Sequence, residues 1–184
     1  MGFNKQFNIE SFLDLTGYDT ETRVSRRKNS KINSQEFFTP YSIVKRMCDK
    51  VPESDWADPD KTFCEPCMGN GQFVLFILYR RIHEYNIPWR KALENMYALE
   101  LMEDNVQETR QRVHELLRNL KSESNQMVAD EICSSDANPM KNFDPTIADQ
   151  IMDRNFVTHD FFTWNFEEWR EMTEEEIKES KKKK

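Results

Sequence analysis

The sequence has no run of about 18 apolar residues, which is the length a helix needs to cross a bilayer. The segment from Met1 to Glu10 also lacks the apolar core of a secretory signal. Cysteine is scarce, with four in 184 residues, so we expect reduced thiols in a cytoplasmic protein. These absences exclude a helical membrane protein and a secreted domain stapled by disulfides.

An excess of positive charge is missing too, because the net charge is -7 at pH 7. Neutralising phosphates supplies most non-specific affinity for nucleic acid, so a surface that clings to it everywhere is excluded. The charge is unevenly spread, since residues 167–179 are rich in glutamate. Any DNA contact is expected to start from a basic stretch, and the alternative is that this stretch is a solvated loop. Its residues are Arg23, Arg26, Arg27, Lys28 and Lys31.

What the sequence does contain is enough apolar material for one compact domain. Hydrophobic residues make up 38% of the chain and charged residues 32%, with 13 Phe and 4 Trp. We divide the chain into an N-terminal helix and basic loop (1–34), a ligand-binding domain (35–166) and a charged tail (167–184), which is either helical or disordered.

The apolar pattern predicts an α/β arrangement. Helices are expected over 8–18, 41–51, from 71 onward, 89–94, 103–120 and 145–153, with a loop over 55–61. Short buried strands are expected over 62–65, 95–100 and 155–160. Alternation of strands and helices predicts a parallel sheet, preceded by a helical N-terminal segment.

Each predicted strand ends in a carboxylate, namely Glu65, Glu100 and Asp160. Ligands of open parallel sheets bind outside the carboxyl ends of the strands, so these side chains are expected to converge on one crevice. Gly69 and Gly71 follow the first strand, where a sharp turn must let a ligand approach the backbone.

The residues around this turn narrow the class of ligand. A phosphate-binding P-loop needs Lys and Ser or Thr after the glycines, where Gln72 and Phe73 stand instead. Two glycines leave the dinucleotide signature incomplete, and Glu65 would repel a pyrophosphate and attract a cation. An adenosine that bears a sulfonium fits better, with Glu100 accepting from ribose hydroxyls and Asp160 from an exocyclic amine.

Two motifs carry a resemblance to a known family. Gln35-Glu36-Phe37-Phe38-Thr39-Pro40 and Glu65-Pro66-Cys67-Met68-Gly69-Asn70-Gly71-Gln72-Phe73 resemble the Q-x-F-F-T-P and [D/E]-P-x-x-G-x-G-x-F motifs of type I and related N6-adenine-specific DNA methyltransferases. Glu100 and His159-Asp160-Phe161-Phe162 resemble the next two motifs, in the same order. The likeness covers residues 35–166.

The resemblance implies a partial Rossmann-like methyltransferase fold with S-adenosylmethionine as cofactor. In that family the hexapeptide lines the methionine end, the glycine turn faces the sulfonium, and the next two acidic residues hold ribose and adenine. The implied cofactor-binding residues are Phe38, Thr39, Pro40, Glu65, Pro66, Gly69, Gly71, Glu100, Asp160 and Phe161.

One motif of the family is missing. No [N/D/S]-P-P-[Y/F/W] tetrapeptide, which binds the target amine and stacks on a flipped base, follows Asp160. Asn138-Pro139-Met140-Lys141 is the nearest string, but it precedes Asp160 and lacks the second proline and the aromatic residue. We therefore assign no catalytic residues and expect a cofactor-binding chain that cannot methylate alone, as a remnant or as part of a split bacterial or phage enzyme.

A second hypothesis belongs to a different class. A non-enzymatic protein could use the same fold to engage a restriction or methylation complex, with its acidic tail imitating the charge of DNA. Under either hypothesis the open edge of a partial sheet is expected to be covered by a second copy or a partner subunit.

Several residue patterns have plainer explanations than chemistry. Cys64 and Cys67 have a zinc-like spacing, but no second pair completes a site, so no metal is predicted and packing as buried apolar thiols is favoured. The three histidines, His83, His114 and His159, share no catalytic partner in sequence. Trp164 and Phe166 are read as plugs over exposed core, with a stacking platform for a base as the alternative.

Overall fold

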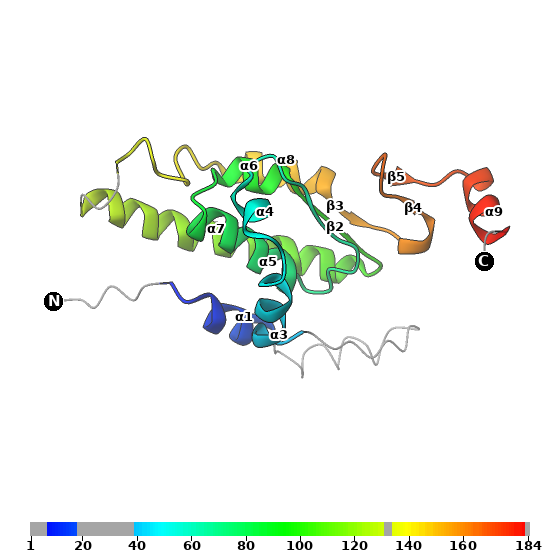
Figure 1. The fold of residues 1–184 in the computed structure, drawn as a ribbon, viewed down its shortest axis with the longest axis horizontal. Coiled ribbons are helices and arrows are strands. Elements are labelled where there is room, and N and C mark those ends of the chain that lie inside the picture. The colour runs from blue at the N-terminus through cyan, green and yellow to red at the C-terminus, as the bar shows by residue number, and fades with distance from the viewer. Residues whose placement is uncertain (1–6, 18–38, 131–133, 183–184) are drawn as a thin grey trace.

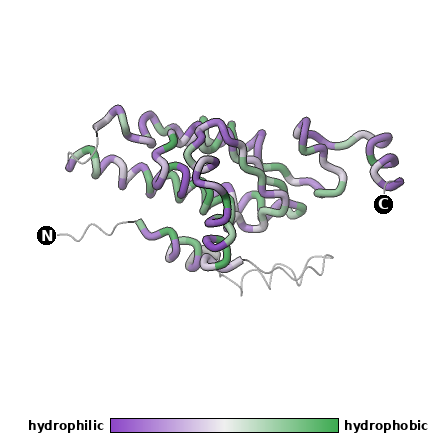
Figure 2. Tube along the Cα trace, viewed as in Figure 1, coloured by the Kyte–Doolittle hydropathy of each residue, from purple (hydrophilic) through white to green (hydrophobic). Residues whose placement is uncertain are grey.

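A computed structural model of the protein describes residues 7–17, 39–130 and 134–182. It is a mixed α/β structure in which helices surround a small parallel sheet (Figure 1). Hydrophobic residues concentrate where the helices meet the sheet, and hydrophilic residues dominate the C-terminal helix (Figure 2). In the described residues no helix is both long enough and apolar enough to span a membrane.

The sheet has three parallel strands, as predicted. They are β1 (Phe63–Glu65), β2 (Met96–Glu100) and β3 (Phe156–Thr158), in the order β1-β2-β3. Glu65 pairs in register with Ala98, and Ala98 with Phe156, so all three strands end near the same edge. Within the described residues β1 and β3 each pair only with β2, which leaves both outer edges open.

One face of the sheet builds the core. Side chains alternate across a strand, and Met96, Ala98 and Phe156 share the face that packs against helices. Two of these helices are α5 (Gln72–Tyr79), which is apolar almost all round, and α7 (Glu103–Ala129). Because α5 is surrounded by other elements, burying every side of it is favourable.

Further helices close this core. Next to α5 lie α1 (Ile9–Gly17) and α3 (Tyr41–Cys48), while α6 (Trp89–Glu94) and α8 (Pro145–Asn155) pack together and lead into β2 and β3. Helix α8 begins at Asp144, whose side chain accepts a hydrogen bond from the Thr146 amide, with proline at the first helical position.

Two local expectations were wrong, for the loop over 55–61 and for the end of the helix at Leu120. The segment predicted as a loop contains a short helix, α4 (Glu53–Ala57), because buried Trp56 stacks on Phe63 at 4.9 Å and anchors the turn. Helix α5 continues as a π-helix, η1 (Arg80–Glu84). Helix α7 runs nine residues beyond the predicted end at Leu120, since neither glycine nor proline interrupts it.

The C-terminal region is ordered from Phe161 to Lys182. It comprises a 3-10 turn, η2 (Phe161–Thr163), a hairpin of β4 (Trp164–Asn165) and β5 (Arg170–Glu171), and α9 (Glu174–Lys182). The hairpin spans the domain boundary that we placed between 166 and 167. In Figure 1 the hairpin and α9 lie beyond the ends of β2 and β3.

The second face of the sheet is covered by the hairpin rather than by helices. The ring of Trp169 meets Tyr97 of β2 edge-on, with centroids 4.8 Å apart, and packs against Trp164 at 5.4 Å. The indole of Trp169 also donates to the Arg154 carbonyl at 2.9 Å. This cover is partial, because Tyr97 and Val157 stay half-exposed on that face and Cys64 is exposed.

Candidate functional site

The turn that follows β1 is held by backbone contacts to β2. The Met68 amide donates to the Leu99 carbonyl at 2.9 Å, and the Gly71 amide closes the turn on the Met68 carbonyl at 2.8 Å. Gly69 and Gly71 have φ angles of +53° and +87°, a region that favours glycine. The sequence-predicted need for glycine at both positions is thus seen in the backbone.

At Gly71 the steric reason is a neighbouring helix. A Cβ atom there would lie 2.6 Å from Cγ2 and 2.9 Å from Oγ1 of Thr109 on α7. We expected the glycines to make room for a ligand. At Gly71 the contact that excludes a side chain comes instead from the protein itself.

Helix α7 supports the turn with polar side chains as well. The Thr109 hydroxyl donates to the Gly69 carbonyl at 3.2 Å, and the buried Arg112 guanidinium donates to the Asn70 carbonyl. A second Arg112 nitrogen lies 3.4 Å from Oε1 of Gln72. These contacts fix the carbonyl groups of the turn on its α7 side and leave its amides toward the strand ends.

Glu100 is the carboxylate that accepts a hydrogen bond from one amide of the turn and from one amide beyond the end of β2. Its Oε2 accepts from the Gly69 amide at 2.9 Å, and its Oε1 accepts from the Met102 amide at 3.1 Å. The side chain therefore ties the end of β2 to the turn after β1. Since each carboxylate oxygen has two lone pairs, Glu100 can still accept hydrogen bonds from a ligand.

Glu65 lies near Glu100, and the negative charge of its carboxylate is unfavourable there. Burial raises the pKa of its carboxyl, the hydrogen bond from the Cys67 amide at 3.2 Å lowers it, and the charge of Glu100 raises it again. In the described part of the chain no lysine or arginine forms a salt bridge with either carboxylate. Two neighbouring acids without a cation favour a positively charged ligand.

Asp160 follows the third strand at the same edge of the sheet. The His159 amide donates to the Glu100 carbonyl at 2.9 Å, which extends the pairing of β3 with β2. The exposed Asp160 side chain accepts from the Phe162 amide at 2.9 Å and so caps η2. One oxygen is thereby engaged locally, and the other accepts no hydrogen bond from the described residues.

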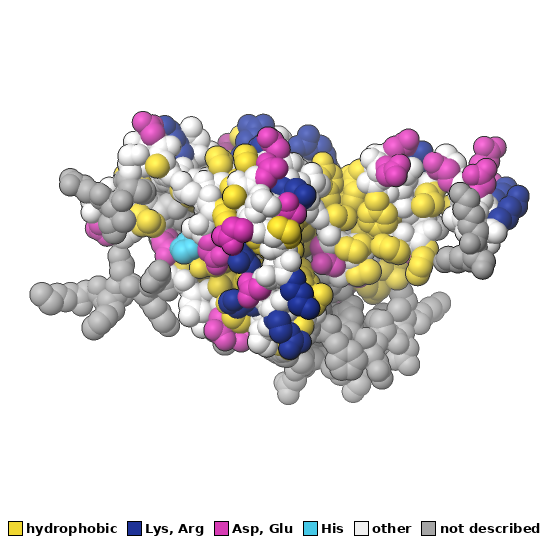
Figure 3. All heavy atoms as spheres, in the orientation of Figure 1, with side chains coloured by type: hydrophobic (Ala, Val, Ile, Leu, Met, Phe, Trp, Pro, Cys, Tyr) yellow, Lys and Arg dark blue, Asp and Glu magenta, His cyan; other side chains and the backbone are white. Residues whose placement is uncertain are grey.

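An exposed aromatic surface begins at Asp160. Phe161 and Phe162 are 41% and 67% exposed, and with Phe166 they form an aromatic surface. In Figure 3 hydrophobic side chains gather around the hairpin. Phe161 packs against Phe166 with centroids 5.2 Å apart. Trp164, in contrast, is buried within the hairpin against Trp169 and His159, while Phe166 remains partly exposed.

The other predicted cofactor-binding residues lie in the turn, at the start of α3 or outside the described residues. Pro66 lies half-buried in the turn after Glu65. Thr39 and Pro40 stand at the start of α3, which packs on α5, the helix that Gly71 begins. Phe38 and the basic residues Arg23, Arg26, Arg27, Lys28 and Lys31 lie outside the described residues.

The cysteines depart from expectation. Cys64 and Cys67 are exposed rather than buried. Cys64 lies on the edge strand β1, and the hairpin covers that face of the sheet only at Tyr97 of β2. Cys48 of α3 is buried, and burial raises the pKa of its thiol to about 11. The part of the chain with described coordinates contains no group of three or more His, Cys, Asp or Glu side chains suited to a metal ion. Cys133 lies outside it.

Each histidine contacts an acidic residue that the sequence did not reveal. His114 lies 2.7 Å from Asp149, His159 lies 3.4 Å from Glu171, and His83 lies 3.4 Å from Glu123. These pairs join elements that are far apart in sequence, so only the three-dimensional arrangement discloses them.

A cavity of about 1000 Å³ lies elsewhere, between α1, η1 and the C-terminal half of α7. None of the predicted cofactor-binding residues that the structure describes lines it. Sequence reasoning missed it because much of its wall belongs to the part of α7 beyond residue 120 that we did not predict. The strand ends and this cavity are therefore two separate candidate sites. Compared with known protein families, curated proteins and solved structures, the chain matches none.

Proposed function

We propose that the chain binds S-adenosylmethionine at the carboxyl ends of its parallel strands, as the cofactor-binding half of an N6-adenine DNA methyltransferase, and that it does not methylate DNA alone. The observation that carries the proposal is the hydrogen bond from the Gly69 amide to Glu100. It joins the glycine turn to the acidic end of the next strand, which are the two parts that bind the nucleoside and its substituent in folds of this kind.

The topology supports a Rossmann-like interpretation. In doubly wound sheets the first three strands stand in the order 3-2-1, and the strands here have that order. Glu65, Glu100 and Asp160 follow three consecutive strands at one edge. The ligand of such a sheet is expected at that edge.

Electrostatics supports a cationic ligand. Burial raises the pKa of the Glu65 carboxyl, and the charge of Glu100 raises it as well. A sulfonium carries a fixed positive charge that cannot be lost by deprotonation, so it would offset this repulsion. A nucleotide phosphate would instead add a further negative charge to the site.

The polar groups at the strand ends suit the rest of the ligand. The free lone pairs of Glu100 are suited to the two ribose hydroxyls, and the second oxygen of Asp160 to the exocyclic amine of adenine. Phe161 stands next to Asp160 and is exposed, so its ring is available to pack on a purine. These roles match those implied by the motif resemblance.

Methyl transfer to DNA needs a further group. Attack by an exocyclic amine depends on a polar cradle that orients it and stabilises the developing charge. After Asp160 the chain forms η2 and the hairpin and offers no asparagine-proline or aspartate-proline cradle. The proposal therefore assigns the cradle and the aromatic residue that holds a flipped base to residues outside these 184.

A second candidate function rests on the acidic rim of the hairpin. Glu167, Glu168 and Glu171 are exposed beside the aromatic surface, and the first turn of α9 adds three more glutamates (Figure 3). Such a surface suits a basic protein face of a restriction or methylation complex. It requires no cofactor, and that separates it from the first proposal.

Calorimetry with S-adenosylmethionine distinguishes the two. Under the first proposal the wild-type chain binds with a dissociation constant on the order of micromolar, about 8 kcal/mol. Asp160→Asn keeps the cap on η2 but removes the charge, and it weakens binding about tenfold. Asp136→Asn, at an exposed aspartate outside the strand ends, is the matched control and leaves binding unchanged.

Two outcomes contradict the proposal. Absence of heat with S-adenosylmethionine removes the cofactor role and leaves the second candidate. Transfer of labelled methyl groups to adenine in DNA by the purified chain shows that it is competent alone.

A further inference from the structure

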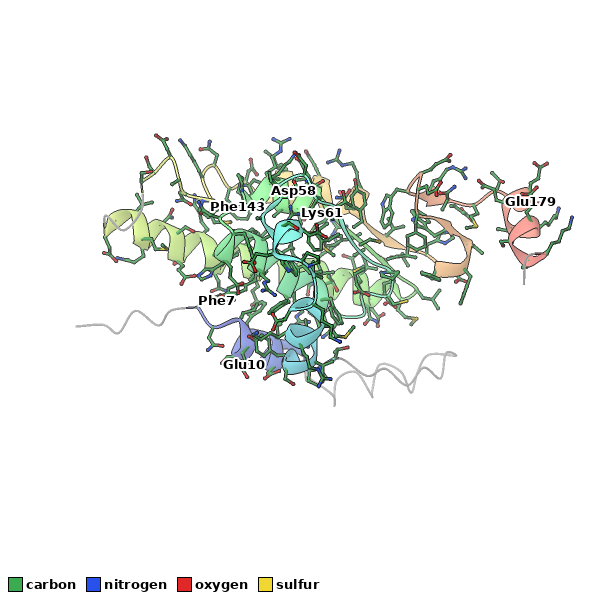
Figure 4. All side chains as sticks on the ribbon, viewed as in Figure 1. Phe7, Glu10, Asp58, Lys61, Phe143 and Glu179 are labelled. Atoms are coloured by element: carbon green, nitrogen blue, oxygen red, sulfur yellow. The ribbon has the colours of Figure 1, made fainter. Side chains whose placement is uncertain are left out.

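The cavity beside α7, named here the α7 cavity, is bounded by three segments distant in sequence. Phe7, Asn8 and Ser11 come from the entry to α1, Ile82 and His83 from η1, and the longest wall from α7 between Asn119 and Asp130. Ala137 and Pro139 close it. Phe7, labelled in Figure 4, lies between the start of α1 and α7.

The charge of the cavity wall determines whether a positively or a negatively charged ligand is favoured. Glu123 and Asp130 are the carboxylates that line the cavity, and no lysine or arginine is among its described lining residues. His83 is the one basic side chain there, and a neutral imidazole would leave both negative charges uncompensated. An anionic ligand is disfavoured and a cation is favoured.

Glu123 is the group that most needs a donor. Its side chain is only 16% exposed, and its Oε2 is buried without a hydrogen bond from the described residues. His83 Nε2 lies 3.4 Å away, close enough for an ionic contact but without hydrogen-bond geometry. This oxygen is closed to the cavity, so a ligand N–H would have to reach the carboxylate at its other oxygen.

The imidazole of His83 is itself held in place. It stacks on the ring of Tyr79 with centroids 4.8 Å apart, and it sits on the π-helix η1, a rare feature that often occurs at functional sites. Burial, with the charges of Glu84 and Glu123, raises the pKa of Tyr79 to about 12, so the phenol stays neutral.

The second carboxylate stands at a defined spacing. Asp130, the residue that follows the last turn of α7, comes seven positions after Glu123, which is two helical turns or about 10 Å. One Asp130 oxygen accepts from Gln126 at 2.8 Å, which leaves the other for a ligand. Between the two acids the wall is apolar, formed by Leu120 and Met127 on α7 with Ile82 and Pro139 nearby.

We propose that the α7 cavity binds a linear aliphatic polyamine, with one ammonium at Glu123, a second at Asp130 and the methylene chain over the apolar residues between them. The cavity is larger than one such chain. Its amides and hydroxyls, which include Asn119, Ser122 and Gln126, can hydrogen-bond the water that fills the remainder. This site is independent of the strand ends and of the proposed function there.

The test is titration calorimetry of the whole chain with spermidine in about 0.15 M salt, where exposed charges are screened. Spermidine is expected to bind saturably, and at least tenfold more tightly than 1,3-diaminopropane, which is too short to reach both acids. Glu123→Gln and Asp130→Asn should each weaken binding about tenfold. Glu115→Gln, at an exposed position of the same helix outside the cavity, should not change it.

Three results would overturn the proposal. They are no saturable binding up to millimolar spermidine, an equal loss in Glu115→Gln and Glu123→Gln, and no preference for the longer amine. The melting temperature of each variant, measured without ligand, separates loss of the site from loss of the fold.

Discussion

The Gly69 amide donates a hydrogen bond to Oε2 of Glu100 at 2.9 Å, across 31 positions of sequence. The other oxygen of the same carboxylate accepts from Met102. One side chain thus fixes both the turn after β1 and the start of α7, so its replacement acts on stability before any ligand is added.

Glu100→Gln replaces one of these acceptors with an amide NH₂ group that must face a backbone N–H. We expect a loss of about 1–2 kcal/mol in the free energy of unfolding, because a part-buried donor loses its partner. Urea denaturation measures it, with Glu94→Gln on the exposed side of α6 as the control. Equal stability of Glu100→Gln and wild type would show that the two hydrogen bonds contribute nothing.

Glu65→Gln should stabilise the protein at neutral pH. The folded-state pKa of Glu65 is raised, so the unfolded chain gives up this proton at a lower pH than the folded chain does. Ionisation therefore costs stability as pH rises above the ordinary glutamate value, and glutamine, which can still accept from Cys67, avoids that cost.

The expected gain is on the order of 1 kcal/mol at pH 7, or about 2–4 °C in melting temperature for a chain of this size. It should vanish near pH 4, where wild-type Glu65 is protonated in both states. Thermal melts of the two proteins across this range test the sign. A variant that is less stable at pH 7 would mean that Glu65 has a compensating cation.

Gly71→Ala should destabilise the fold by about 2–3 kcal/mol. The backbone at φ +87° disfavours alanine, and the new methyl group meets Thr109. In a Thr109→Ala background the same substitution should cost about 1 kcal/mol less, because only the backbone strain and a looser contact remain. A double-mutant cycle measures the difference. Additive costs would show that α7 is not the steric limit.

Trp169→Ala should lower stability by about 1–3 kcal/mol and uncover the second face of the sheet. The variant loses the ring contacts to Tyr97 and Trp164 and the hydrogen bond to Arg154. Binding of an apolar dye should rise and self-association should appear in sedimentation. Phe162→Ala, at a more exposed aromatic residue of the same surface, should leave stability nearly unchanged.

The sequence was sufficient to predict the structure where the local apolar pattern agrees with the burial of the residues. Strands β1, β2 and β3, the glycine turn and the convergence of Glu65 with Glu100 follow from apolar runs that end in a carboxylate. Helix α4 escaped prediction because one tryptophan, packed on a distant phenylalanine, outweighs a polar segment. The hairpin escaped for a similar reason, since Trp169 is fixed by contacts to Tyr97 and Arg154 that no periodicity reports.

The α7 cavity could not be predicted from sequence motifs. Its acids, Glu123 and Asp130, lie in a stretch for which no helix was predicted, and its histidine comes from η1, 40 positions before Glu123. Only the tertiary structure, which places α1 and η1 across the cavity from α7, brings these polar residues together. The role of Glu100 was predicted as a ligand contact, whereas its tie to Gly69 had no sequence signal.

The most direct test of the central claim is to map, by amide chemical shifts, where S-adenosylmethionine contacts the folded chain. The account predicts saturable shifts at Cys67, Gly69 and Met102, whose amides donate to Glu65 and Glu100, with Asn119 and Ser122 of the α7 cavity unmoved. Shifts confined to the α7 cavity, or no shifts at saturating ligand, would contradict it.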